Sequence, residues 1–512
     1  MHKKIKKLAS MLFSRLGIGI ILMALQFLFI VFSVVYLSAI KYYVYIALEL
    51  MSLVVVMFIV SKQDNPSYKI SWIIIIMALP LFGGLFYLFW GNKHIPHKMK
   101  KSIDQFNSYA MEKPNPQNSC RDSLAKKSPK LKRQIDYIYN LSGFPLWQGT
   151  KCEYYKIGEE LFESLKRELK NAKKFILMEY FIIAPGKMWD EIHEILLEKL
   201  KEGVEIKIMF DDIGCIKTLP NRYDQILRSE GFEVLVFNSF RPRLNVTMNY
   251  RDHRKIAVID GNTAFTGGIN LADEYINQIV RFGHWKDTGC MLKGDAVYNF
   301  TVMFLELWQF EGQVKLDYEK YKPTYSATEE EGFVMPFGDS PMDRLNIAEN
   351  AYMQIINEAK DYVYIMTPYL ILDNEMINAL SMAAQSGIDV RIMTPHVPDK
   401  WYVHPVTRSY YEPLLEAGVR IFEYTPGFIH AKSFVSDDSV GIIGTTNMDF
   451  RSFYLHFECG VYFAYNSLVY SVKNDFLETQ RVCHEVTLEE EKKVSLSRRI
   501  GRSILKFFAP LM

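Results

Sequence analysis

The chain has 512 residues, a formal net charge of +2 and a hydrophobic content of 49%. That length is enough for two or three domains that each bury a core. The small net charge gives no electrostatic reason to expect nucleic acid as a partner. Six scattered cysteines include no Cys-x-x-Cys pair. This disfavours a disulfide framework or a structural zinc site, and favours buried thiols in a reducing compartment.

Apolar segments are concentrated at the start of the chain. A basic N-terminus precedes an uncharged run that is too long for a signal-peptide core. A second run contains Glu49, and a third is uncharged with aromatic residues at both ends, where interfacial rings are expected. For each run the alternative is a buried core helix. We expect a transmembrane region at residues 1–92, with candidate helices at 16–40, 44–60 and 71–91.

The charges beside these runs do not agree on one topology. The start of the chain is basic, and so is the segment that follows the third run. Basic flanks stay on the cytoplasmic side, so three full crossings conflict with one of them. Either only two runs cross fully, or one flank is misinterpreted. Residues 93–134 indicate a basic linker, which could lie along anionic lipid head groups or simply be solvated.

From about residue 135 the chain alternates between helix and strand patterns, and it does so twice. Residues 172–180 match 359–367, where an amphipathic helix runs into an apolar strand. Residues 202–209 match 386–393, where a glycine ends a helix before a strand. Such β-α-β units favour a largely parallel sheet with helices on its faces. We expect an α/β fold of two duplicated halves on a pseudo-twofold axis, at 135–328 and 342–487, joined by a hinge at 329–341.

Each half contains one His-x-Lys-x-x-x-x-Asp pattern followed by a glycine-rich trailer that ends in asparagine. The offset between equivalent members is constant, because 430 − 253 and 447 − 270 both equal 177. One such octet could arise by chance, but two with matched trailers at one spacing indicate a shared function. The members are His253, Lys255, Asp260 and Asn270 in the first half, and His430, Lys432, Asp437 and Asn447 in the second.

The residue types of this motif fit a phosphate group. On an extended backbone the histidine and the lysine share a face, whereas the aspartate has the opposite parity and is expected to brace the site or form an ion pair. If the halves pack on a twofold, one site holds two imidazoles, two ammonium groups and two asparagine amides, which bind phosphate oxygens. One histidine would attack phosphorus, and the other would exchange protons with the alcohols. The lysines supply the charge that a metal would, so no metal or other cofactor is expected.

Two carboxylates downstream of the motifs are candidate partners for the histidines. Asp287 and Glu458 each open an apolar strand and could hold the ring nitrogen that does not attack. The alternative is that they are ordinary strand-end carboxylates. His284, His404 and His456 are expected to be structural or rim residues.

The tail at 488–512 is basic and amphipathic. Apolar residues alternate with arginines and lysines at helical spacing. This pattern fits a helix on a membrane surface, and equally a helix docked on the catalytic core.

The duplicated motif with its trailers resembles the phospholipase D superfamily, whose fold is two such α/β halves around one site. Within it the chain is similar to bacterial cardiolipin synthases from about residue 65 to the end. The apolar run at 16–40 is a departure from that pattern and affects topology rather than chemistry. The segments that carry the likeness are 66–69, 79–83, 87–91, 249–255, 367–370, 408–411, 427–432, 445–452 and 509–512.

The resemblance implies a phosphatidyltransferase that converts two phosphatidylglycerol molecules into cardiolipin and glycerol through a phosphatidyl-histidine. The resemblance assigns the catalytic roles to His253, Lys255, Asp260, His430, Lys432 and Asp437. Expected partners are phosphatidylglycerol, other anionic phospholipids and the membrane. We expect a multi-pass protein of the bacterial plasma membrane with its catalytic part on the cytoplasmic side.

Two other functions compete with this interpretation. A phospholipase D-type hydrolase would use the same site with water as the acceptor, and a non-catalytic membrane scaffold would not need the intact motifs. The sequence leaves open which histidine attacks, which lipids serve as acceptors, and the oligomeric state.

Overall fold

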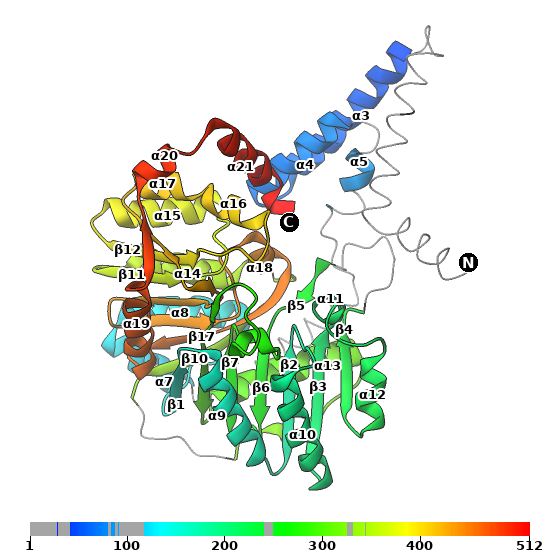
Figure 1. Ribbon diagram of the computed structural model, residues 1–512, viewed down its shortest axis with the longest axis vertical. Coiled ribbons are helices and arrows are strands. Elements are labelled where there is room, and N and C mark those ends of the chain that lie inside the picture. Colours follow the sequence, from blue (N-terminus) through cyan, green and yellow to red (C-terminus); the bar gives the residue numbers. More distant parts are fainter. Residues whose placement is uncertain are drawn as a thin grey trace. The chain divides into compact units, whose positions relative to one another are not determined.

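The chain forms two compact units in the computed structural model (Figure 1). We call the first the apolar unit; it comprises Met1–Ile95, Phe240–Asn249 and Phe507–Met512. The second, the motif unit, comprises Pro96–Ser239 and Tyr250–Lys506. The structure describes residues 28, 41–79, 83–87, 91, 117–239, 249–324, 331–343 and 345–511.

The apolar unit contains helices α3 (Lys41–Ser61), α4 (Pro66–Ala78) and α5 (Gly83–Phe86). Helix α4 begins where the Asn65 side chain accepts a hydrogen bond from the Ser67 N–H at 2.9 Å, with proline in the first turn. Trp72 and Tyr87 pack edge to face at 5.4 Å and form a small core with Ile59 and Ile76. Many other large apolar side chains of α3 and α4 are exposed.

The predicted transmembrane helices are only partly covered by the described residues. The run at 16–40 lies outside them apart from residue 28. The run at 44–60 lies within α3, and the run at 71–91 is divided between α4 and α5. None of the helices in the described part of the chain combines the length and the apolar character needed to cross a membrane. The transmembrane region therefore stays a prediction.

The first half of the motif unit is a seven-stranded sheet in the order β1-β9-β7-β6-β2-β3-β4. Apolar stripes on α9 and α10 pack on it, as Leu161, Leu165 and Leu169 of α9 illustrate. The elements are β1 (Lys151–Tyr155), α9 (Gly158–Lys170), β2 (Phe175–Tyr180), α10 (Lys187–Lys201), β3 (Glu205–Asp211), α11 (Asp212–Cys215), α12 (Tyr223–Ser229), β4 (Glu233–Phe237), β5 (Arg251–Asp252), β6 (Lys255–Ile259), β7 (Thr263–Gly267), η3 (Asp273–Ile276), β8 (His284–Lys286), β9 (Gly289–Lys293), α13 (Val297–Gly312) and η4 (Tyr318–Tyr321).

The second half repeats this order as β10-β17-β16-β15-β11-β12-β13 and adds β18 at the edge. The expected duplication of an α/β fold is therefore confirmed. Figure 1 shows the first half in green below the second in yellow and orange. The elements are β10 (Phe333–Asp339), α14 (Ile347–Glu358), β11 (Tyr362–Met366), α15 (Asn374–Gln385), β12 (Asp389–Pro395), α16 (Val403–Arg408), α17 (Tyr411–Glu416), β13 (Arg420–Tyr424), β14 (Gly427–Ile429), β15 (Ser433–Ser436), β16 (Val440–Gly444), α18 (Phe450–Tyr454), β17 (His456–Ala464), α19 (Ser467–Gln480), β18 (Cys483–Val486), α20 (Leu488–Lys492), α21 (Leu496–Phe508) and η5 (Ala509–Leu511).

The prediction of a largely parallel sheet is wrong. In each half three strands are parallel, such as β2, β3 and β4 in the first. Strands β6, β7 and β9 of the same sheet are antiparallel, and β6 and β7 form a tight hairpin at Asp260 and Gly261, both with positive φ. Such a hairpin needs no crossover helix, and both residue types adopt the left-handed conformation more readily than most. The β-α-β pattern therefore covered only part of each sheet.

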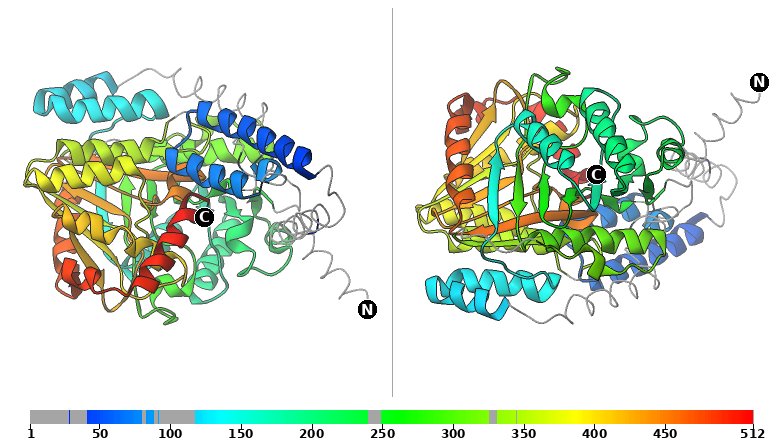
Figure 2. Two further views of the ribbon diagram at one scale, coloured as in Figure 1. Left: turned by 90° about the horizontal axis from the view of Figure 1, so that it is seen from above. Right: turned by 90° about the horizontal axis from the view of Figure 1, so that it is seen from below.

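The expected basic linker is partly helical. Helix α7 (Gln117–Lys127) lies within it, and helix α8 (Pro129–Ser142) begins in it and continues beyond its expected end at 134. Helix α8 packs on α14 and β10 of the second half. Figure 2 shows α7 and α8 in cyan. Helix α8 begins at Ser128, whose hydroxyl accepts the Leu131 N–H at 3.3 Å, and ends at Gly143 in the left-handed conformation. Amphipathic spacing buries Leu131, Ile135 and Ile138. The abundance of polar and basic residues hid this stripe.

The stretch at 329–341, expected to be a hinge, contains strand β10. This strand pairs along its whole length with β17, from Phe333 opposite Ala464 to Asp339 opposite Glu458. The second half therefore begins at Phe333. The glycine and proline that indicated a hinge, Gly338 and Pro336, lie inside the strand instead.

The two halves contact each other reciprocally. Strand β5 of the first half pairs with β17 of the second, and β14 of the second half pairs with β8 of the first. An exchange of equivalent contacts is the property of a twofold relation. Both contacts between the halves lie next to the motif histidines. His253 directly follows β5, and His430 directly follows β14.

Candidate active site

The aspartates of the two motifs lie in the hairpin turns, away from the histidines. The Asp260 carboxylate accepts the backbone N–H groups of Lys173, Lys174 and Phe175 at 2.9, 2.7 and 3.0 Å. Asp437 does the same for the three residues that enter β11, at 2.8, 3.0 and 3.0 Å. Each carboxylate thus ties the motif hairpin to the start of the neighbouring strand. This geometry agrees with the bracing alternative of the sequence analysis, not with an ion pair.

The histidine of the first half is held by a carboxylate from the second. His253 Nδ1 lies 2.9 and 3.0 Å from the two carboxylate oxygens of Glu458, and both side chains are buried. The backbone N–H of His253 also donates to the Phe457 carbonyl at 2.9 Å, which continues the β5–β17 pairing. With Nδ1 bound to the carboxylate, the lone pair of Nε2 remains for chemistry.

The second histidine is held by the equivalent arrangement, with a carboxylate from the first half. His430 Nδ1 lies 2.6 Å from Asp287 Oδ2, and its backbone N–H donates to the Lys286 carbonyl at 2.7 Å. The structure therefore brings Asp287 and Glu458 to the histidines as a crossed pair. Rings of Tyr275 and Trp285 pack on His430 at 5.6 and 5.3 Å.

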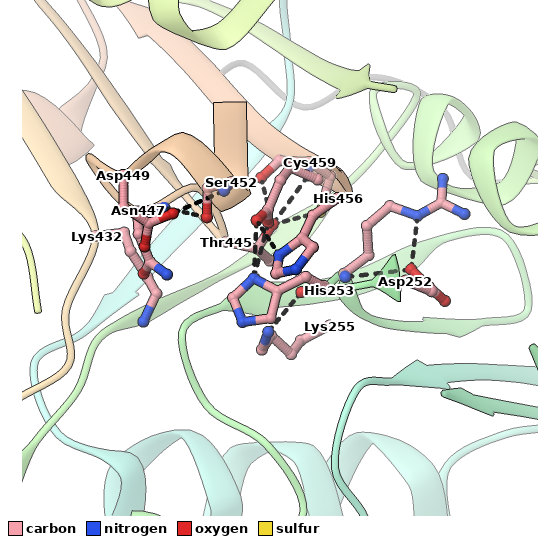
Figure 3. Close-up of polar contacts among 12 residues, drawn as sticks. Asp252, His253, Lys255, Lys432, Thr445, Asn447, Asp449, Ser452, His456 and Cys459 are labelled. Atoms are coloured by element: carbon pink, nitrogen blue, oxygen red, sulfur yellow. Dashed lines mark hydrogen bonds and ion pairs between the residues drawn. The ribbon is translucent and has the colours of Figure 1, made fainter. Parts of the chain in front are cut away.

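The two lysines lie at the same site with their charge largely buried. Each ammonium donates to the backbone carbonyl of the histidine two residues before it, His253 or His430. Lys432 Nζ also lies 2.8 Å from His430 Nδ1. Figure 3 shows Lys255 next to His253, and Lys432 next to Asn447 and Asp449.

Burial shapes the protonation of the whole site. It lowers the pKa of Lys255 to about 8 and that of Lys432 to about 7, against the attraction of Glu458 and Asp287. Burial, followed by repulsion from the lysine ammonium groups, lowers the pKa of His253 and His430 well below the ordinary value. Both histidines are therefore neutral in the free protein at neutral pH, as a nucleophile requires.

One glycine of the first trailer, Gly268, leaves space for the carboxylate of Asp287. A Cβ at Gly268 would lie 2.1 Å from Asp287 Oδ1, so a side chain there would displace this carboxylate from His430. The second half has Thr445 at the equivalent position, and its hydroxyl donates to Glu458 Oε2. The trailer therefore contributes directly to both dyads. Gly268 and Thr445 lie in the matched trailers, but their role is not visible in the sequence because it depends on carboxylates that come close only in the fold.

The two asparagines predicted as phosphate ligands differ in their surroundings. Asn270 accepts the Ile182 N–H at 3.0 Å and donates to the Tyr275 hydroxyl at 2.7 Å, so much of its amide is already engaged. Asn447 is buried beside Lys432, and its Oδ1 has no hydrogen-bond partner in the described part of the chain. Phosphate binding, which would use the Nδ2 donor of each amide, stays a prediction for both.

His456 lies at the site and was expected to be structural or at the rim. Its ring is 5.2 Å from that of His253, and its Nδ1 lies 3.5 Å from Glu458 Oε1. Burial lowers the pKa of His456 to about 3. Donor atoms of His253, His456 and Glu458 lie within 4.8 Å of one another, close enough to hold a metal ion.

A second ionic layer supports the first motif from behind. Arg254, next to His253, contacts Glu179 at 2.6 Å and Asp252 at 3.3 Å, all buried. Arg251 pairs with Asp211 at 3.2 Å. No sequence pattern predicts a role for these arginines, because their pairing across strands is visible only after folding.

Comparison with known proteins identifies the family. A model described as "Cardiolipin synthase, PLD-like domain" matches residues 165–291 and 352–479, and "Phospholipase_D-nuclease N-terminal" matches 50–92. A cardiolipin synthase of Halalkalibacterium halodurans is 33% identical, with 88% of this chain and 90% of that protein covered. The chain belongs to the cardiolipin synthase family. The resemblance stated from the motifs is confirmed.

Two further matches place this member of the cardiolipin synthase family among its relatives. A Streptococcus mutans protein whose name gives no function is 42% identical, with 89% of this chain and 99% of that protein covered. The crystal structure of phosphatidylserine synthase from Haemophilus influenzae matches with a TM-score of 0.57 at 15% identity, over 75% of this chain and 98% of that one. The latter likeness shows the fold alone.

Proposed function

We propose that this protein is a cardiolipin synthase, which transfers a phosphatidyl group from one phosphatidylglycerol to another and releases glycerol. The observation that carries the proposal is the crossed pair of dyads, His253 with Glu458 and His430 with Asp287, next to two lysines. Membership of the cardiolipin synthase family names the lipid substrate.

The first chemical step forms a phosphatidyl-histidine. Nε2 of one histidine attacks phosphorus as the bond from phosphorus to the departing glycerol oxygen breaks. The other histidine gives its Nε2 proton to that oxygen, so neutral glycerol leaves. Lys255 and Lys432 offset the negative charge of the phosphoryl oxygens in the transition state, and Asn447 and Asn270 donate to those oxygens.

The second step reverses the proton transfer. The histidine that gave its proton removes one from the glycerol hydroxyl of a second phosphatidylglycerol. The resulting oxygen attacks phosphorus, the bond from phosphorus to nitrogen breaks, and cardiolipin leaves. One histidine must carry a proton when substrate is bound. The anionic phosphate supplies the reason, because it offsets the lysine charges that lower the histidine pKa in the free protein.

The membrane location belongs to the same proposal. The apolar run at 16–40 and the exposed apolar side chains of α3, such as Leu50, Val54 and Met57, support attachment of the apolar unit to a membrane. Attachment there would concentrate donor and acceptor lipids at the site. We propose a bacterial plasma membrane protein with this site on the cytoplasmic side.

Product analysis of phosphatidylglycerol labelled in its acyl chains tests the proposal. The purified chain is incubated with vesicles of this lipid, and the products are separated by thin-layer chromatography and mass spectrometry. We expect cardiolipin, with free glycerol in equal amount. Phosphatidic acid without cardiolipin would instead establish a phospholipase D-type hydrolase. If neither cardiolipin nor phosphatidic acid forms, the result would favour the non-catalytic scaffold.

A further inference from the structure

The amphipathic helix α21 in the tail is oriented with its apolar side outward. Leu496, Ile500 and Ile504 lie one above another at a spacing of four residues, and they are 74%, 52% and 56% exposed. Helix α9 shows the ordinary arrangement, in which the same spacing of leucines is buried on the sheet.

The basic side of α21 binds the motif unit. Arg502 is buried against the carboxylate of Glu491, at 13% and 4% side-chain exposure. Lys506 Nζ lies 4.0 Å from the centre of the Tyr410 ring, within the same unit.

A third contact is at the flank of the helix, where Arg499 reaches both oxygens of Glu412 at 3.0 and 2.9 Å. Turning the apolar stripe inward would break all these contacts and leave the Glu491 carboxylate buried without its partner. The outward orientation is therefore built into the helix.

We propose that the stripe formed by Leu496, Ile500 and Ile504 docks on the surface of a lipid bilayer. The stripe consists of three branched aliphatic side chains on the outer side of an amphipathic helix, which suits the boundary between head groups and acyl chains of a bilayer.

The end of the chain points to the same partner. The residues after Lys506 belong to the apolar unit, where the Ser71 hydroxyl donates to the Phe507 carbonyl at 2.8 Å. Ser71 lies on α4, which exposes Ile70, Ile74 and Met77. Only two residues of the chain separate Ile504 from this unit. The inference rests on the proposed function in one respect, that the substrates of the protein are lipids of a bilayer.

A fluorescent probe on the stripe tests the docking directly. The full chain, with Cys120, Cys152 and Cys483 replaced by serine, carries bimane at Ile504→Cys in nanodiscs of phosphatidylglycerol and phosphatidylcholine. We expect lipids with a nitroxide on the acyl chain to quench this probe at least twofold more strongly than in the control variant, Tyr470→Cys. Tyr470 lies on α19 and is 58% exposed, similar to Ile504.

The possible results separate lipid from other partners. Equal quenching at both positions would overturn the proposal. A blue-shifted probe at position 504 that lipid nitroxides do not quench would also overturn it, because the stripe would then be covered by protein. Since quenching needs no turnover, the result is independent of whether the chain makes cardiolipin.

A triple variant tests the consequence for activity. Leu496→Ser, Ile500→Ser and Ile504→Ser remove only exposed side chains, so the thermal midpoint should stay unchanged. We expect several-fold lower activity on vesicles and unchanged activity on short-chain phosphatidylglycerol dispersed as monomers. The matched control is Met382→Ser, Tyr470→Ser and Val482→Ser, three exposed apolar residues elsewhere in the motif unit. Equal activity of both triple variants on vesicles would overturn the proposed role.

Discussion

At the scale of the residue, the chemistry of this protein depends on two neutral histidines and two lysines that are buried in one site. Burial keeps His253 and His430 neutral, and a carboxylate from the opposite half holds Nδ1 of each ring. An asymmetry remains between the dyads, because Lys432 Nζ lies 2.8 Å from the Nδ1 of His430. His253 has Glu458 as the partner of its Nδ1, and His456 packs beside it. The two histidines are therefore equivalent in sequence but not in environment.

Removing either motif histidine should abolish transfer. We expect His253→Gln and His430→Gln each to lower kcat by about a thousandfold or more, within the range that nucleophilic and acid–base groups contribute. The measurement is the rate of cardiolipin formation from labelled phosphatidylglycerol. The control is His284→Gln, since His284 pairs with the Tyr424 hydroxyl rather than with a dyad. A loss below tenfold in both motif variants would contradict the proposed mechanism.

The buried lysines predict an alkaline limit to substrate capture. Their pKa values of about 7 for Lys432 and about 8 for Lys255 lie below the ordinary 10.5, so raising the pH removes positive charge from the free protein. On the alkaline side of the pH profile we therefore expect kcat/KM for phosphatidylglycerol to be highest below about pH 7 and to fall between about pH 7 and 9. Lys432→Arg should move the lower step upward, because a guanidinium stays charged. A flat profile to pH 9.5 would contradict this assignment.

At the scale of the element, the motif hairpins are held to their neighbouring strands by the aspartates. Asp260 adopts positive φ and accepts three backbone N–H groups, and Asp437 repeats both features. The hairpin thus fixes the strand that carries Lys255. We expect Asp260 to affect catalysis only through the position of this strand, since its carboxylate is engaged by three backbone N–H groups.

Substitution of this aspartate should be felt as lost stability. We expect Asp260→Ala to lower the free energy of unfolding by about 1–3 kcal/mol, because three exposed or partly buried N–H groups lose their acceptor. Asp260→Asn should cost less, because asparagine tolerates positive φ and keeps one acceptor oxygen. Chemical denaturation measures both. If the folded Asp260→Ala protein lost as much kcat as His253→Gln, bracing of the hairpin alone would not explain the role of Asp260.

At the scale of the whole molecule, the site exists only because two half-folds exchange carboxylates. Glu458 reaches His253 through the β5–β17 pairing, and Asp287 reaches His430 through β8–β14. Neither half contains a complete dyad. The apolar unit adds a region with many exposed aliphatic side chains, and the proposed function gives that region a lipid environment.

The full chain should behave as an integral membrane protein. We expect it to remain in the membrane pellet after extraction with alkaline carbonate, because the run at 16–40 is uncharged and long enough to cross a bilayer. Peripheral proteins are released by this treatment. Recovery of the intact chain in the supernatant would show that the predicted transmembrane region does not span the membrane.

Local patterns predicted some elements well and others poorly. The strands after Gly203 and Gly387 were visible because a helix-ending glycine precedes an apolar strand. Helix α8 was not recognised, because its lysines and arginine dominate the composition of that stretch while its apolar stripe is narrow. Strand β10 was missed because Pro336 and Gly338 are typical of loops.

The sequence by itself determined that the protein has two equivalent motifs, and hence two half-folds with one chemistry, because spacing and residue types repeat at a constant offset. It also named Asp287 and Glu458 as candidates, since each opens an apolar strand. Only the tertiary structure decided which carboxylate reaches which histidine, namely Glu458 to His253 and Asp287 to His430. The reason is physical: strand pairing between the halves sets this crossing, and residues that are 205 and 143 positions apart leave no local pattern.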